Sequence, residues 1–131
     1  MSENQPIVLV VDDNEVNRDV LSRRLTRYGY SAESAATGRE ALRMIRKKEY
    51  DLVLLDIMMP EMNGYQVLER IKEDPLTRSL PVIVISALDD IDSVVKCIEL
   101  GAEDYLPKPF NPMMLKARIS ASLDKKRLRD R

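Results

Sequence analysis

The sequence predicts an α/β fold in which helices cover both faces of a five-stranded parallel sheet. Five short strand-like segments alternate along the chain with five segments of helical periodicity, and the links between them are short. Alternation at this spacing implies right-handed crossovers and therefore parallel strands. Of the two common strand orders of doubly wound sheets, five strands favour 2-1-3-4-5, which sets the first and third strands side by side.

The expected strands are recognised by composition and by the residues that end them. Ile7–Val11 and Leu52–Leu55 are unbroken aliphatic runs, which suit strands covered on both faces, and aspartate follows each run. The remaining expected strands are the weaker, alternating segment 30–35, the strongly β-branched Val82–Ser86, and the short segment 104–106 before Pro107, Lys108 and Pro109.

The first two expected helices carry their own start signals. Asn14 is a suitable cap for the first helix, which Gly29 closes. Thr37 and Glu40 have the spacing of a capping box at the start of the second helix. The apolar residues expected to face the core are Val16, Val20, Leu21 and Leu25 in the first helix, and Ala41, Leu42 and Ile45 in the second.

The last three helices are bounded in the same way. The third resumes after the turn pair Asn63 and Gly64, and the fourth starts at Asp89 or Asp90. The fifth starts at Asn111 and Pro112. The residues expected to face the core are Val67, Leu68 and Ile71 in the third helix, Val94, Val95, Ile98 and Leu100 before Gly101 in the fourth, and Met114, Leu115, Ile119 and Leu123 in the fifth.

Composition narrows the classes of function. The 131 residues suit one domain, and 21 basic against 22 acidic residues give no general electrostatic reason to bind nucleic acid or anionic membranes. No apolar run approaches the ~20 residues that a membrane span needs, and the initial MSENQP does not resemble a signal peptide, so we expect a cytoplasmic protein.

The lone Cys97 is expected to pack in a helix. Histidine is absent, which leaves carboxylates, hydroxyls and lysine for any chemistry.

Polar residues follow the predicted strands at their carboxyl ends, the edge where open α/β sheets bind ligands. Asp12, Asp13 and Asp56 are expected to meet there, flanked by Ser86 and Lys108. Each residue alone is typical of a helix cap or a surface charge, but together the carboxylates repel one another unless a cation such as Mg²⁺ neutralises them. A carboxylate can also attack phosphorus, while a metal, a lysine and a hydroxyl stabilise the transferring group. The set therefore predicts phosphoryl transfer.

At these residues the chain resembles the receiver domain of two-component response regulators, from residue 7 to about residue 123. The motifs are VVDD (10–13), LLDIMMPEMNG (54–64), VISA (84–87) and GAEDYLPKPF (101–110). The resemblance implies the flavodoxin-like fold of chemotaxis regulators, with Asp56 as the phosphoacceptor. It also implies that Mg²⁺ is held by Asp12, Asp13, Asp56 and the backbone carbonyl of Met58.

The resemblance further implies a switch that phosphorylation activates. In this family Ser86 would bond the phosphoryl group, Lys108 would pair with it, and the Lys108–Pro109 peptide bond would be cis. Tyr105 would turn inward as the Ser86 hydroxyl moves toward the phosphoryl group. The surface of the fourth helix, fifth strand and fifth helix would then regulate an effector domain, a separate protein or a second copy of the chain.

The phosphoryl donor must come from outside, because the chain has no histidine. The resemblance implies a histidine kinase or a histidine phosphotransfer protein that docks near the first helix, which makes Asn14, Val16 and Asn17 candidate contacts. Roles in capping and packing explain these three residues equally well.

A second class of protein shares the aspartate chemistry, namely phosphatases and phosphotransferases similar to haloacid dehalogenases. Those enzymes have Asp-x-Asp at the nucleophile, and the second acid serves as general acid or base. Here Met58 occupies that position. No base is evident here. In receivers the positions of Met58 and Leu88 flank the approach of the attacking water, so the resemblance implies that these apolar side chains shield the acyl phosphate. We therefore expect the phosphorylated state to persist, which favours a switch over a turnover enzyme.

We expect a receiver domain over residues 1–123 and a basic tail over residues 124–131. The tail, DKKRLRDR, holds five basic and two acidic residues, and Leu128 is its only apolar residue. With no core to cover, it is either a solvated terminus or the start of a helical linker to an output domain.

Overall fold

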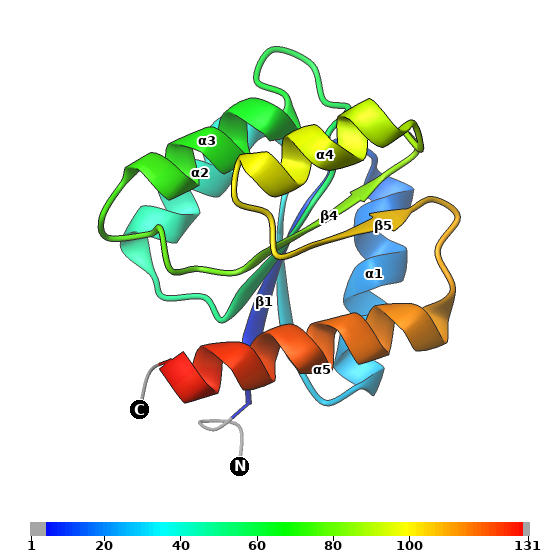
Figure 1. Ribbon diagram of the computed structural model, residues 1–131. Coiled ribbons are helices and arrows are strands. Elements are labelled where there is room, and N and C mark those ends of the chain that lie inside the picture. The colour runs from blue at the N-terminus through cyan, green and yellow to red at the C-terminus, as the bar shows by residue number, and fades with distance from the viewer. Residues whose placement is uncertain (1–4, 130–131) are drawn as a thin grey trace.

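The computed structural model describes residues 5–129, in which strands and helices alternate as predicted (Figure 1). Parts of two sequence predictions, the initial MSENQP and the end of the basic tail, lie outside the described residues. The strands are β1 Ile7–Val11, β2 Ser31–Ala35, β3 Leu52–Leu55, β4 Val82–Ser86 and β5 Asp104–Pro107. The helices are α1 Glu15–Arg27, α2 Gly38–Lys47, α3 Gly64–Glu73, α4 Ile91–Glu99 and α5 Pro112–Arg129.

The five strands form one parallel sheet in the order β2-β1-β3-β4-β5. The predicted fold class, a doubly wound flavodoxin-like sheet with five helices, is therefore confirmed. Val11 at the end of β1 pairs with Ala35 on one side and with Leu55 on the other. Because these strands end in register, the residues that follow them lie together at one edge of the sheet.

Two apolar layers hold the helices against the sheet. Successive residues of a strand point to opposite faces, so Leu9 and Val11 pack into one layer while Val8 and Val10 pack into the other. Helices α2, α3 and α4 cover the first face, and α1 and α5 cover the second (Figure 1). Within residues 5–129 no helix combines the length and the apolar character of a membrane span.

The capping box predicted for α2 forms only in part. The Thr37 side chain accepts the Glu40 N–H as predicted, at 3.1 Å. The Glu40 carboxylate, however, accepts the N–H of Ala36 at 2.8 Å, one residue before the cap. A complete reciprocal box instead starts α3, between Asn63 and Gln66, where the sequence indicated only a turn. The other predicted caps, Asn14 and Asp90, each accept the backbone N–H of the residue three positions later.

Several apolar residues predicted to face the core lie at the surface instead. A helix packed on a sheet buries only a narrow stripe, and in α4 the fully buried residue is Cys97, whose predicted packing role is confirmed. Its neighbours Val95 and Ile98 point to solvent. The exposed fractions are 68% for Val16, 44% for Val20, 44% for Val95, 48% for Ile98 and 43% for Met114.

Candidate functional site

The ends of β1 and β3 hold two aspartates side by side. The Asp56 N–H donates to the Val11 carbonyl at 2.9 Å, and the Asp12 N–H donates to the Ala35 carbonyl at 3.2 Å. The hydrogen bonding of the sheet thus continues one residue beyond each strand and fixes both backbones. Asp12 is 2% exposed and Asp56 is 7% exposed, so both acids are buried.

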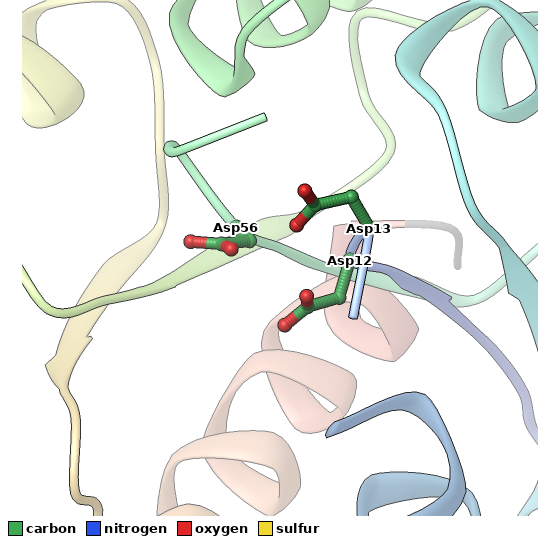
Figure 2. Close-up of side chains that lie close together, drawn as sticks. All are labelled: Asp12, Asp13 and Asp56. Carbon is green, nitrogen blue, oxygen red and sulfur yellow. The ribbon is translucent and has the colours of Figure 1, made fainter. Parts of the chain in front are cut away.

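Asp13 completes a cluster of three carboxylates, which Figure 2 shows converging from the ends of β1 and β3. One carboxylate oxygen from each of Asp12, Asp13 and Asp56 lies within 4.8 Å of the other two. Asp13 itself is exposed, so the cluster opens to solvent on one side. The three acids that the sequence predicted to meet do lie together.

Lys108 supplies the cation of this cluster. Its Nζ lies 3.0 Å from Asp12 Oδ2 and 3.5 Å from Asp56 Oδ2. Its backbone N–H donates to the Ser86 carbonyl at 2.8 Å, which ties the loop after β5 to the end of β4. The Lys108–Pro109 peptide bond is cis, as expected. Three carboxylates against one ammonium leave the cluster with excess negative charge, which suits a hard divalent cation with oxygen ligands.

Hydrogen bonds from α1 orient Asp12. Its Oδ1 accepts the Asn14 N–H at 2.9 Å, and its Oδ2 accepts the Asn17 side-chain amide at 3.3 Å. The Arg18 guanidinium donates to the Asp12 carbonyl at 2.9 Å. The sequence did not reveal the role of Arg18, because a contact across six residues leaves no local signal.

The environment of Asp56 shifts its proton affinity. Burial raises the pKa of Asp56, the nearby Lys108 charge lowers it, and the Asp12 carboxylate raises it again. The Met58 N–H, 3.3 Å from Asp56 Oδ1, also favours the ionised form. A bound divalent cation would oppose the rise and keep the carboxylate ionised.

The loop after Asp56 folds back against it, and this requires glycine at position 64. A Cβ at Gly64 would lie 2.4 Å from the Asp56 carbonyl oxygen and 2.6 Å from the Ile57 Cα. The Gly64 N–H donates to the Ile57 carbonyl at 2.9 Å, which closes the loop. In this loop the Met58 side chain is 57% exposed. From the sequence, Gly64 was predicted only as part of a turn. Its position directly after Asn63, which caps α3, was the signal that could have indicated a tight loop.

Ser86 and Tyr105 meet at Leu88, in the loop between β4 and α4. The Ser86 side chain is fully buried, and its Oγ accepts the Leu88 N–H at 3.1 Å. The Tyr105 hydroxyl donates to the Leu88 carbonyl. Burial raises the pKa of Tyr105, and a hydrogen bond from Ser86 opposes that rise. One loop residue therefore contacts both side chains that were predicted to act in a switch.

Comparison with known proteins identifies the class. The model of the family described as "Response regulator receiver domain" matches residues 8–120. The chain therefore belongs to the response regulator receiver domain family.

Individual relatives agree with this assignment. A probable transcriptional regulator, ycf27 of Cyanidium caldarium, is 41% identical over 122 residues, which cover 93% of this chain and 48% of the relative. The response regulator PleD of Caulobacter vibrioides is 43% identical over 112 residues, which cover 86% of this chain and 25% of PleD. A crystal structure of a response regulator from Chloroflexus aurantiacus superposes with a TM-score of 0.89 at 36% identity, covering 92% of this chain and 99% of that one. The chain thus spans less than half the length of these two curated relatives and nearly the whole of the solved chain from Chloroflexus aurantiacus.

Family membership bears on the two classes of protein that the sequence left open. Receiver domains are signalling switches of two-component systems, generally without turnover of a substrate. Nothing in the comparisons supports the alternative of a phosphatase similar to haloacid dehalogenases. The acidic cluster of Asp12, Asp13 and Asp56 is a pocket that could hold a metal ion.

Proposed function

We propose that this domain is a phosphorylation-activated switch of a cytoplasmic two-component phosphorelay. It accepts a phosphoryl group on Asp56 from a histidine kinase or a histidine phosphotransfer protein. The observation that carries the proposal is the cluster of three carboxylates within 4.8 Å of one another around a single lysine. Asp12 and Asp56 are both buried and both face Lys108. Both carboxylate oxygens of Asp12 already accept hydrogen bonds from Asn14, Asn17 or Lys108, whereas Asp56 Oδ2 lies 3.5 Å from the lysine, so Asp56 is the acid more free to act as a nucleophile.

Asp12, Asp13, Asp56 and the Met58 carbonyl would hold Mg²⁺. Their all-oxygen donor set and the excess negative charge fit that ion, and the exposed side at Asp13 leaves room for water and phosphate oxygens. When bound, Mg²⁺ neutralises charge on the phosphoryl oxygens. The predicted Met58 contact remains a proposal.

The transfer step forms one bond and breaks one. An Asp56 carboxylate oxygen attacks phosphorus, and the bond from phosphorus to the donor's nitrogen breaks, so that the donor leaves with the electron pair. The Lys108 ammonium, already 3.5 Å from Asp56 Oδ2, pairs with a phosphoryl oxygen. The Ser86 hydroxyl donates to another phosphoryl oxygen.

Leu88 offers a direct route from that hydroxyl to the surface. When Ser86 turns toward the phosphoryl group, its Oγ gives up the Leu88 N–H, and the loop that also binds the Tyr105 hydroxyl is freed to move. Tyr105 then turns inward, and the surface of α4, β5 and α5 changes. This surface carries exposed apolar side chains that suit an effector domain, a partner protein or a second copy: Ile91, Val95, Ile98 and Met113.

The phosphoryl donor docks beside α1. A groove of about 450 Å³ runs between α1 and the loop after β5, lined by Asn17, Val20 and Phe110 and by Lys108 of the carboxylate cluster. Val16, on the same helix, is also exposed. Of the predicted donor contacts, Asn17 lines this groove together with Lys108, whose ammonium lies 3.5 Å from Asp56 Oδ2, and this supports a donor site here. Asn14 and Val16 remain proposed contacts.

The tail beyond Leu123 begins a linker to an output domain. Helix α5 continues to Arg129 without a break, and Leu128 is 64% exposed. Lys125 lies 3.9 Å from Glu103, and Lys126 lies 3.9 Å from Asp51, so weak ion pairs rather than apolar packing join this turn to the domain. Receiver residues 1–123 and a linker from 124 onward remain our proposed division.

The test is phosphorylation by acetyl phosphate in Mg²⁺, read by intact-mass spectrometry. Asp56→Asn is expected to abolish the phosphoryl adduct, because an amide of the same shape cannot attack phosphorus. Asp51→Asn, which removes an acid at the opposite edge of the sheet, is the matched control and is expected to be phosphorylated like the wild type. An Asp56→Asn adduct equal to that of the wild type would exclude Asp56 as the acceptor.

A further inference from the structure

Helix α2 carries a basic stripe on its exposed side. Its buried residues are Gly38, Ala41 and Ile45, which face the core. The stripe repeats at the helical spacing of three and four residues and consists of four exposed cations and the half-buried Leu42. The cations are Arg39, Arg43, Arg46 and Lys47.

The stripe lines a groove of about 470 Å³ between α2 and α3. Arg70 of α3 adds a fifth cation, while Leu42 and Met62 form an apolar floor that packs on the core. The acidic residues of the two helices are exposed but do not line the groove: Glu40, Glu69 and Glu73. The groove is separate from the carboxylate cluster, none of whose residues lines it.

Nothing within residues 5–129 neutralises these five cations. None of them takes part in an ion pair or a side-chain hydrogen bond there, whereas other exposed cations do, such as Arg23 with Asp19 and Arg118 with Asp104. Like charges four residues apart on a helix, as in Arg39 and Arg43, repel one another and destabilise it. A ligand with negative charge would remove that repulsion.

We propose that the α2–α3 groove binds an acidic segment of a partner protein that presents an apolar side chain between carboxylates. Arginine predominates among the cations, and its planar guanidinium suits bidentate contact with carboxylate. The floor of Leu42 and Met62 favours an apolar side chain over a polar phosphate backbone. No aromatic residue among those that line the groove offers a platform for base stacking, which disfavours single-stranded nucleic acid, and a concave groove does not match a flat membrane.

The probe for this site is a fluorescein-labelled peptide of glutamates that flank a central pair of leucines, titrated with the protein and followed by anisotropy. The comparison ligands are the same peptide with serines in place of the leucines, oligothymidylate of equal charge, and phosphatidylglycerol vesicles. We expect the leucine peptide to bind most tightly, with an affinity that falls as salt rises.

Two double variants locate the binding. Arg43→Gln with Arg46→Gln is expected to weaken peptide binding by about tenfold, since each exposed ion pair contributes a factor of up to about five. Arg23→Gln with Arg27→Gln removes equal charge from α1 and is expected to leave binding within about twofold. Circular dichroism and phosphorylation by acetyl phosphate confirm that both variants fold.

Several results would overturn the proposal. Absence of saturable peptide binding, equal loss in the two double variants, or equal binding of the serine peptide would show that the groove is not a site for an acidic, partly apolar segment. Tighter binding of the oligonucleotide or of the vesicles would assign the basic stripe to a different class of partner.

Discussion

The acids at the two edges of the sheet differ in how their charge is balanced. At the amino ends of the strands each acid has a cation of its own: Asp51 with Lys126, Glu103 with Lys125, and Asp104 with Arg118. At the carboxyl ends Lys108 is the one cation within residues 5–129 that pairs with the carboxylate cluster of Asp12, Asp13 and Asp56.

This contrast shows which property distinguishes a functional acid at a strand end from a structural one. Asp51 accepts the Ile7 N–H at 2.8 Å and faces a cation, so its charge is balanced and its role is structural. Asp56 is buried beside another carboxylate, and its pKa is raised chiefly by that burial. The crowded carboxylates around Asp56 need a further positive partner, such as a metal ion, whereas the charge of Asp51 is already balanced.

Among variants that compare the two edges of the sheet, the largest expected effect is on the affinity for Mg²⁺. Asp13→Asn removes a charged oxygen ligand. Loss of a residue that only hydrogen-bonds a metal ligand lowers metal affinity by about 10- to 100-fold, so Mg²⁺ binding is expected to weaken by at least about tenfold. Asp51→Asn is expected to leave it unchanged. Titration of both variants with Mg²⁺ checks this, and equal affinities would contradict a metal site at the carboxyl edge.

The next effect concerns Lys108. Lys108→Ala is expected to retain Mg²⁺ binding, because the oxygen ligands remain, but to uncouple phosphorylation from the change at the surface of α4, β5 and α5. Without Mg²⁺ the variant leaves buried carboxylates with no cation, so it is expected to be less stable than the wild type, and Mg²⁺ is expected to stabilise it more. Thermal unfolding with and without Mg²⁺ measures the difference. An identical Mg²⁺ stabilisation in both proteins would argue against Lys108 as the balancing charge.

The smallest expected effect is on the lifetime of the phosphorylated state. The exposed Met58 side chain cannot orient water, so Met58→Glu is expected to shorten the lifetime by about tenfold, less than the ~10²–10⁴ that a well-positioned general base supplies. Met113→Glu, at an exposed methionine on α5, serves as the control. Decay of the phosphoryl adduct in Mg²⁺, followed by intact mass, gives both rates, and an unchanged rate for Met58→Glu would contradict the prediction.

The fold and the acidic cluster could be predicted because both follow from patterns along the strands. Leu52–Leu55 reads as a buried strand from its aliphatic run alone, and the strand order then places Asp12 beside Asp56. The meeting of Ser86 and Tyr105 at Leu88 could not be predicted, because it depends on how a loop is folded rather than on any spacing.

Helix faces were predicted less well than strands, for a physical reason. Apolar spacing on α1 and α4 shows that a stripe exists but does not show what covers it, and the stripe includes Val16 and Ile98, which are exposed. In the same way, the sequence spacing of Thr37 and Glu40 could not reveal that the carboxylate reaches Ala36. Packing against the sheet and the neighbouring loops determines which side of a helix is buried and which N–H a side chain contacts.

A charge placed on Asp56 is expected to change the α4–β5–α5 surface, and amide hydrogen exchange with and without beryllofluoride and Mg²⁺ measures that change. We expect exchange to change in the β4–α4 loop, in α4 and β5, and across residues 120–131, while the α2–α3 region stays the same. The Asp56→Asn protein is expected to show no change. Identical exchange in the wild-type protein in both states, with fluorine NMR showing that beryllofluoride is bound, would contradict the claim.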